Sequence, residues 1–234
     1  MARNRGKHPN DDKIFAEKWL PVFKEAIDDH CHLLTRGYAS ESALEFVGNR
    51  YKLNKRQRKA IYRISASQQD IDNRNSRLVS PKELSGNHLE IDGFNLLILL
   101  ESALSGAYIF KGRDGTYRDI SSVHGSYKRV IQTPDAIIMT GKFLESLSPK
   151  SVKWWFDSPV SNSGRLKTIL YELAGEHGFK WDVELSFNPD KELIQTDHVV
   201  VSSDGWILNH DIEWLNLGGL LIEGQIPDAN IIDV

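Results

Sequence analysis

Three aspartates each follow a short apolar run of the kind that forms a buried strand. Asp92 follows the letters LEI, Asp157 follows WWF, and Asp204 follows VVVSS. If these runs are neighbouring parallel strands, their carboxyl ends meet at one edge of a sheet, where α/β proteins bind ligands. Carboxylate oxygens and water are the ligands that Mg²⁺ and Mn²⁺ prefer. The pattern predicts a divalent metal site formed by the three acids, with helix capping as the alternative role for each.

The segment after Asp92 offers two more polar side chains. Gly93 and Asn95 follow the acid closely, so backbone and amide could approach a ligand. On the helix expected over residues 95–104, Glu101 lies within an arc of about 120° with Asn95, on an otherwise apolar surface. Glu101 is therefore a candidate catalytic residue facing the crevice, or alternatively a member of an exposed polar stripe.

A serine-rich loop after Asp157 predicts a phosphate site. A helix is expected to begin near Arg165, and helix amino termini bind anions. Arg165 and Lys167 lie in its first turn, where cations oppose the helix dipole, so a bound phosphate would explain them. Capping of the helix by a serine is the alternative. The candidate phosphate-binding residues are Asn95, Ser158, Ser161, Asn162, Ser163, Arg165 and Lys167.

A basic stretch near the amino terminus predicts a second binding surface. Residues 50–63 contain seven basic residues and no acidic one, after a helix and a short turn. This order resembles a helix-turn-helix, in which the second helix offers cations to phosphates; a solvated basic helix is the alternative. Tyr51 and Tyr62 are expected to pack inward. The candidate nucleic-acid contacts are Arg50, Lys52, Lys55, Arg56, Arg58, Lys59 and Arg63.

The periodicity divides the chain into two parts. Residues 1–70 read as a small helical domain, with a kink or boundary at Pro21 and helix ends near Gly37 and Gly48. Residues 71–87 are polar and read as a linker.

Residues 88–234 alternate between strands and helices. Four apolar runs, at 88–91, 152–156, 179–185 and 198–201, alternate with helical segments over 95–104, 134–147 and 164–177. An Asp114-Gly115 turn predicts a hairpin. This order predicts an α/β fold with a mostly parallel sheet covered on both faces.

Composition excludes several classes of protein. The 234 residues include one cysteine, so a disulfide framework is excluded, and the spacing of Cys and His fits no zinc module. The longest apolar run is far below the roughly 20 residues of a membrane span, so we expect a cytoplasmic protein without a membrane partner. Phosphate-loop, dinucleotide-binding, serine-hydrolase and zincin motifs are absent. His124 is a conceivable acid or base.

The net charge of −3 hides an asymmetry. Residues 1–85 carry 17 Lys+Arg against 11 Asp+Glu, a net +6, whereas residues 86–234 carry 12 against 21, a net −9. A basic part could meet a polyanion while an acidic part gathers metal ions. Chance scatter in a two-part protein is the alternative.

Several segments resemble an uncharacterised prokaryotic family, number 434 among the domains of unknown function. They span nearly the whole chain: HPNDDKIFAEKWLPVFKEAIDDH, ESALEFVGNRYKLNKRQRKA, IDGFNLLILLESALSG, GRDGTYRDISSVHGSYKR and FDSPVSNSGRL. This resemblance implies no activity.

A more distant resemblance links the acidic part to the PIN and NYN nuclease superfamily. The letters IDGFN, which begin at Ile91, are similar to its opening strand and acid, and VVVSSD, which ends at Asp204, is similar to its late strand. The resemblance implies a PIN-like three-layer domain that binds metal through Asp92, Asp157 and Asp204. It also implies Glu101 or Asp197 as a fourth member. The serine-rich loop after Asp157 departs from the family pattern and puts that residue in doubt.

These inferences lead to one functional expectation and two alternatives. We expect a nuclease that uses Mg²⁺ or Mn²⁺ to hydrolyse phosphodiesters, with RNA favoured over DNA by the superfamily resemblance alone. A nucleic-acid-binding protein that does not cleave its ligand is the first alternative, and a hydrolase of small phosphate esters is the second.

Overall fold

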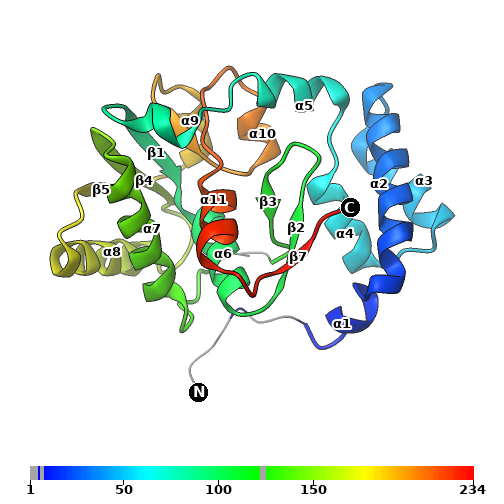
Figure 1. Cartoon of the computed structure of the whole chain (residues 1–234), viewed down its shortest axis with the longest axis horizontal. Coiled ribbons are helices and arrows are strands. Elements are labelled where there is room, and N and C mark those ends of the chain that lie inside the picture. Colours follow the sequence, from blue (N-terminus) through cyan, green and yellow to red (C-terminus); the bar gives the residue numbers. More distant parts are fainter. Residues whose placement is uncertain (1–4, 6–7, 122–124) are drawn as a thin grey trace.

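The strands of the computed structural model form two sheets surrounded by helices (Figure 1). The structure describes Arg5, residues 8–121 and residues 125–234. The larger sheet has four parallel strands in the order β5-β4-β1-β6. These are β1 (His88–Asp92), β4 (Ser151–Asp157), β5 (Trp181–Ser186) and β6 (Val199–Val201). The predicted α/β class and mostly parallel sheet are therefore confirmed.

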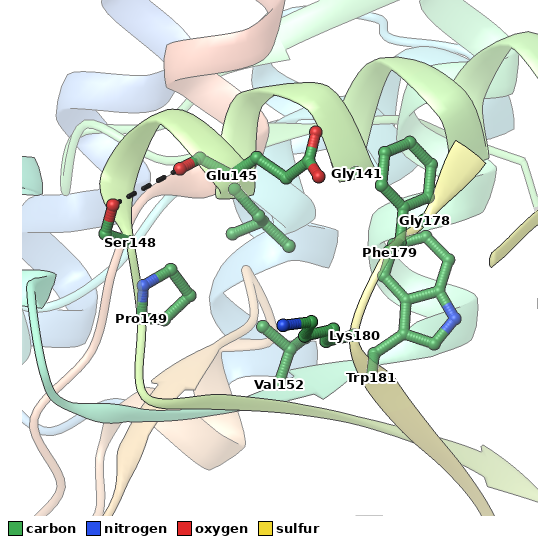
Figure 2. Close-up of a pocket in the computed structure, with 10 residues that line it drawn as sticks. Gly141, Glu145, Ser148, Pro149, Val152, Gly178, Phe179, Lys180 and Trp181 are labelled. Atoms are coloured by element: carbon green, nitrogen blue, oxygen red, sulfur yellow. Dashed lines mark hydrogen bonds between the residues drawn. The ribbon is translucent and has the colours of Figure 1, made fainter.

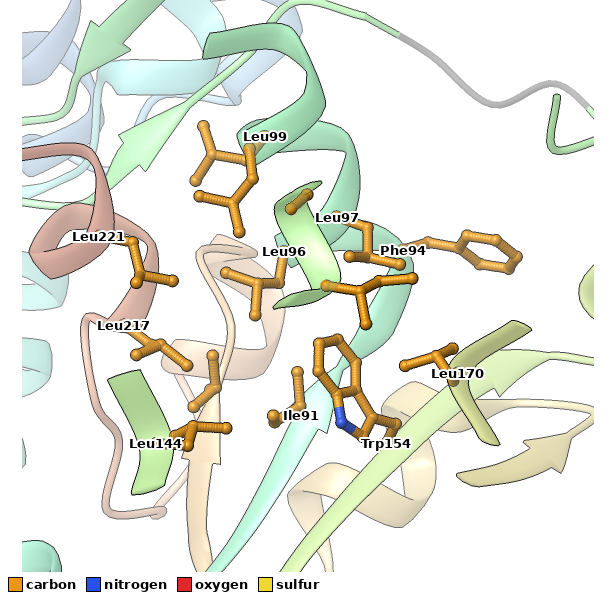
Figure 3. Packing of buried hydrophobic residues seen from close by; sticks show 14 of the residues in the cluster. Ile91, Phe94, Leu96, Leu97, Leu99, Leu144, Trp154, Leu170, Leu217 and Leu221 are labelled. Atoms are coloured by element: carbon orange, nitrogen blue, oxygen red, sulfur yellow. The ribbon is translucent and has the colours of Figure 1, made fainter. Parts of the chain in front are cut away.

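One face of this sheet carries the main hydrophobic core. Ile91 and Trp154 project from β1 and β4 toward leucines of the helix after β1, such as Leu96 and Leu97 (Figure 3). All four side chains are at most 2% exposed, and burying each contributes about 1.5–3 kcal/mol. The helices that enclose this core are α6 (Gly93–Leu104), α7 (Thr133–Leu147), α8 (Ser163–His177) and α11 (Leu217–Gln225).

A smaller cluster completes the three layers on the other face. Val200 and Trp155 alternate with the inward residues of their strands, so they face the opposite side. They pack against Leu193 of α9 (Pro189–Ile194) and Ile207 of α10 (Gly205–Leu208).

The second sheet joins distant parts of the chain. Strands β2 (Tyr108–Lys111) and β3 (Tyr117–Arg118) form the predicted hairpin, and Gly115 adopts the positive φ of 77° that its turn requires. Strand β7 (Asn230–Ile232) pairs in parallel with β2 and was not predicted, because three residues give no clear period.

The amino-terminal helices have mostly the expected limits. Pro21 marks a boundary, since α2 begins at Leu20 and its first turn tolerates proline, and this helix ends before Gly37. Gly48 does not end the next helix; a Cβ there would lie 2.5 Å from Arg58 Nε, so the glycine admits a packed guanidinium. The helical elements are α1 (Asp11–Ile14), η1 (Glu17–Trp19), α2 (Leu20–Thr35), α3 (Ser40–Arg50) and α4 (Lys55–Ile64).

The segment interpreted as a linker is folded. It overlaps helix α5 (Gln68–Asn75), which Ser67 caps, and includes the short helix η2 (Pro81–Leu84). Arg74 of α5 is buried and donates to Asp114 Oδ2 over 2.5 Å, and this contact 40 residues away is invisible to local patterning.

The helical part and the α/β part are docked. Phe15, Phe23 and Ile27 share one cluster with Phe110 of β2 and Ile232 of β7. The second sheet therefore lies between the two parts and completes the core of the helices. No helix among the described residues is both long and apolar enough to cross a membrane.

Candidate functional site

The carboxyl edge of the parallel sheet gathers four aspartates, which we call the acid edge: Asp92, Asp157, Asp190 and Asp204. Asp92 and Asp157 end the adjacent strands β1 and β4, and Asp204 follows β6 on the other side of β1. The three predicted acids are thus brought to one edge. Asp190, in the first turn of α9, joins them after β5.

Burial and mutual repulsion raise the pKa values at the acid edge. Loss of solvation raises the pKa of Asp92 to about 8, and the charges of Asp190 and Asp204 add to this effect. Burial likewise raises the pKa of Asp190, followed by the charges of Asp204 and Asp157. Burial alone raises the pKa of Asp157. The site therefore concentrates negative charge that a cation would relieve.

Two neighbours fix the carboxylate of Asp92. Ser202 Oγ donates to its Oδ2 over 2.9 Å, and the Asn95 backbone N–H donates to its Oδ1 over 3.4 Å as a helix cap. Each carboxylate oxygen has two lone pairs, so both oxygens keep one acceptor position. Asp92 therefore serves as the predicted helix cap and retains capacity for a ligand.

The donor set fits a hard divalent cation, although the acids do not enclose one. Among the described residues, no three or more His, Cys, Asp or Glu side chains form a group that could hold a metal ion. Mg²⁺ is commonly held by one or two carboxylates, with water and substrate phosphate completing its octahedron. The acid edge matches that open form of binding in its chemistry.

Asn95 and Gly93 have structural duties. Asn95 Oδ1 accepts from the backbone N–H and the hydroxyl of Ser203, at 3.0 and 2.8 Å, so it clamps the end of β6 to α6. A Cβ on Gly93 would lie 2.3 Å from Phe156 Cε1, so this glycine is needed for close packing. The expected approach of a ligand to Gly93 is thus not the reason for its small size.

Glu101 lies in a separate network. Its carboxylate is fully buried and accepts from Arg5 Nε over 2.5 Å, from Thr133 Oγ1 over 2.6 Å and from the Tyr127 hydroxyl. Glu101 was expected to face the crevice or to lie on an exposed polar stripe. It does neither, because its side chain faces neither the acid edge nor solvent. Asp197, the other expected fourth acid, precedes β6 and so lies toward the amino edge of the sheet.

The serine-rich loop is held mainly by its backbone. Ser158 N–H donates to Ser186 O over 2.8 Å, and Ser161 bridges to Ser126. Asn162 Nδ2 donates to Tyr127 O over 2.9 Å. Asn162 occupies the amino-terminal cap position of α8, but its side chain accepts no hydrogen bond from the helix. Ser163 begins α8 and is buried. Capping by Ser161 or Ser163 is therefore not observed.

A cationic hollow adjoins the start of α8. Lys128, Arg129 and Arg165 line a cavity of about 230 Å³ together with Asn162, and none of the described residues that line it is acidic. Lys167 is directed elsewhere, because its Nζ lies 3.7 Å from Glu184 Oε2. Of the two predicted cations, Arg165 alone reaches this hollow.

The basic stretch of α4 borders a larger groove, of about 860 Å³. Tyr62 is 50% exposed and lines this groove, so the expectation that it packs inward is wrong; Tyr51 is half-buried. The lining residues are His8, Leu44, Leu53, Lys55, Arg56, Arg58, Lys59 and Tyr62.

The seven cations predicted to contact nucleic acid differ in whether other residues of the protein already bind their side chains. Arg56 pairs with buried Asp11 through contacts of 2.5 and 2.8 Å, and Arg58 donates to Leu53 O and Asn49 Oδ1. Lys59 donates to Ser121 O over 3.3 Å.

The other four predicted cations are Arg50, Lys52, Lys55 and Arg63, and they lie outside such pairs with buried acids. Arg50 lies 3.4 Å from Asp29, and Arg63 is half-buried. Lys52 and Lys55 are exposed, which makes them the most available to a polyanion.

A further cavity lies at the amino edge of the parallel sheet, away from the predicted metal site. It measures about 350 Å³ and lies between the end of α7 and the starts of β4 and β5, where Glu145, Phe179 and Trp181 line it (Figure 2). Because these strands are parallel, this cavity lies at the amino edge, opposite the aspartates. His124 lies outside the described residues.

Sequence reasoning missed Asp190 and Ser202. Asp190 follows the third predicted strand, so the same rule that selected the other three acids applied to it; the three residues that separate it from β5 concealed the pattern. Ser202 directly follows the apolar run 198–201, and its spacing alone gives no sign that its hydroxyl contacts Asp92.

The fold and site define an α/β protein with an acidic carboxyl edge and a docked helical part. Residues 81–220 match the family described as a domain of unknown function, DUF5616, and residues 22–77 match a protein of unknown function, DUF434. The chain belongs to the DUF5616 family, and its amino-terminal helices carry the DUF434 match that the resemblance predicted. The expectation that the DUF434 resemblance spans nearly the whole chain is wrong, because the segments IDGFNLLILLESALSG, GRDGTYRDISSVHGSYKR and FDSPVSNSGRL lie in the part that matches DUF5616.

One relative and one structural comparison complete the picture. The chain is 34% identical over 188 residues to the uncharacterized protein MJ0935 of Methanocaldococcus jannaschii, which covers 80% of this chain and 89% of that protein. No solved structure gives a significant match.

Proposed function

We propose that this protein is a metal-dependent nuclease that hydrolyses phosphodiesters of RNA at the acid edge. The observation that carries the proposal is the placement of Asp92, Asp157, Asp190 and Asp204 at one edge of the sheet, with pKa values raised at three of them. Asp92, Asp157 and Asp204 are half-buried and Asp190 is exposed. Like charges that share a partly desolvated edge repel each other, and a divalent cation is a common means by which proteins offset such repulsion.

Asp92 and Asp204 are the proposed principal ligands. Ser202 links them, because its hydroxyl donates to Asp92 and accepts from the Asp204 backbone N–H over 3.0 Å. Asp204 Oδ1 caps α10 through Trp206 N–H, which leaves Oδ2 for a ligand. A bound Mg²⁺ or Mn²⁺ supplies an activated water and neutralises charge on the phosphate. Asp157 and Asp190 would add negative charge beside the ion.

The cationic hollow of Lys128, Arg129 and Arg165 is the proposed holder of a neighbouring phosphate. Three like charges around one cavity repel each other, and phosphate would turn that repulsion into attraction. Ser158, Ser161, Asn162 and Ser163 belong to the loop that joins this hollow to Asp157.

The α4 groove is the proposed docking surface for the rest of a nucleic acid chain. Exposed Lys55 supplies charge in the groove, exposed Lys52 lies just before α4, and Tyr62 supplies an aromatic face. RNA is preferred here only because the PIN and NYN resemblance favours it.

A nucleic-acid-binding protein without cleavage is the second candidate. It is favoured by the open arrangement of the acids, in which no three of the described residues form a metal-holding group. It would use the same hollow and groove. Hydrolysis of small phosphate esters has less support, because it leaves the groove unused.

The decisive test compares wild type with Asp92→Asn on labelled single-stranded RNA and DNA in Mn²⁺. Asp197→Asn, at the opposite edge, is the matched control. We expect cleavage by wild type and the control, and a loss of at least about 100-fold in Asp92→Asn. Equal cleavage by all three proteins would indicate a contaminant. Absence of cleavage across varied substrates, with binding retained, would establish the second candidate.

A further inference from the structure

Two exposed aromatic side chains stand at opposite ends of the acid edge. Phe187 directly follows β5 and is 83% exposed, and Trp206 lies two residues after Asp204 and is 51% exposed. Because β5 and β6 are the outer strands of the parallel sheet, Asp92 and Asp157, which end the two inner strands, lie between the segments that carry these two aromatics.

The spacing suits a short run of nucleotides. Three strand intervals separate β5 from β6, and at about 4.8 Å each they span roughly 14 Å. An extended single strand covers that length in two to three nucleotides. A duplex keeps its bases stacked inside, so it would present sugars, phosphates and base edges to these rings but not the faces of the bases.

Trp206 is held in position before any ligand arrives. Its ring meets the His210 ring at 61° with 4.5 Å between centroids, and its backbone N–H is bonded to Asp204 Oδ1 over 2.7 Å. His210 Nδ1 in turn lies 2.8 Å from the Trp206 carbonyl oxygen. An indole that is fixed on one side and open on the other loses little freedom when a base stacks on it.

We propose that Trp206 and Phe187 are base-stacking platforms that make single-stranded nucleic acid the substrate class of the acid edge. This inference rests on the proposed function, because it takes the aspartates as the place where the backbone lies. Aromatic faces bind bases of any sequence, so weak sequence preference is expected.

Binding without metal separates this inference from catalysis. Fluorescence anisotropy in EDTA would compare a 12-nucleotide oligouridylate, an abasic chain of the same length and an RNA duplex. Trp206→Ala and Phe187→Ala should each weaken oligouridylate binding at least about 5-fold and leave the abasic chain unaffected. Tyr38→Ala, which removes a ring 60% exposed on the helical part, is the matched control and should change neither.

Two further measurements keep the result interpretable. Trp206→Phe retains a ring and should restore most of the binding, even if the alanine variant folds less well. If the alanine variants bind oligouridylate as tightly as wild type, or if the abasic chain binds equally, the stacking inference is wrong. A change in sedimentation instead would assign the rings to a protein contact. The stacking inference also fails if the duplex binds as tightly as the single strand. The proposed function is separate from it: if the aromatic variants cleave like wild type and only Asp92→Asn loses cleavage, the nuclease proposal is still supported.

Discussion

Arg118 Nε donates to the carbonyl oxygen of Ser203 over 2.7 Å, which ties the second sheet to the loop that carries Asp204. The same guanidinium makes contacts of 3.0 and 2.7 Å with Asp114, which Arg74 also contacts. Burial opposes ionisation of Asp114, but the two arginines outweigh it and hold its pKa well below the usual range. A buried ion group thus supports one end of the acid edge.

Replacing Arg118 by Ala should destabilise the fold by about 3–5 kcal/mol, because Asp114 keeps a buried charge with one partner fewer. Urea denaturation would measure the loss. Lys111→Ala is the control; it breaks the exposed pair with Asp233 and should cost at most about 1 kcal/mol. Equal losses would mean that the buried group gives no special support.

The raised pKa of Asp92 predicts a stability change with pH. The folded protein holds a proton on this carboxyl up to about pH 8, whereas the unfolded chain releases it near pH 4. Stability contributed by the protonated form is therefore lost as pH rises between these values. In EDTA, Asp92→Asn should raise Tm more at pH 8 than at pH 5.5, by about 3–6 °C. An identical gain at both pH values would contradict the raised pKa.

The same proton should compete with a metal ion. Metal ligands bind in their deprotonated form, so apparent Mn²⁺ affinity should rise up to about 10-fold per pH unit between pH 6 and 8. Calorimetric titration at three pH values would show the slope. Asp92→Asn should bind more weakly and with a flatter dependence, and Asp197→Asn should behave as wild type.

Glu101→Gln distinguishes a structural acid from a catalytic one. The amide keeps the shape of the side chain but loses its charge beside Arg5, so we expect a loss of about 1–3 kcal/mol in the free energy of unfolding. Cleavage per folded molecule should remain within about 2-fold of wild type. A fall comparable with that of Asp92→Asn would return Glu101 to the catalytic residues.

The α4 groove can be tested through exposed Lys55, which lines it, and exposed Lys52, which lies just before α4. Replacing Lys52 and Lys55 together by Ala should weaken RNA binding and reduce the slope of log affinity against log salt by roughly 1–2. A pair at the amino edge of the sheet, Lys150 and Lys180, provides the charge-matched control. An unchanged slope would mean that these lysines do not contact the nucleic acid.

Local sequence patterns predicted what depends on nearest neighbours along the chain. Asp92, Asp157 and Asp204 were found because a parallel sheet places strand ends together whatever its exact order. Helix α5 was missed because it is polar, and part of its support comes from the distant contact between Arg74 and Asp114. Glu101 was placed on a polar stripe because its partners Arg5 and Tyr127 lie far away in sequence. Contacts between side chains that are remote in sequence produce no periodic pattern from which they could be predicted.

Strand β7 has a consequence for how the protein is made. Ile232 completes the cluster that contains Phe15 and Phe23, so the first helices to be synthesised lack part of their core until residues 230–232 have left the ribosome. The amino-terminal helices must therefore wait, partly uncovered, while about 200 further residues are added. Their final folding is timed by the carboxyl-terminal strand.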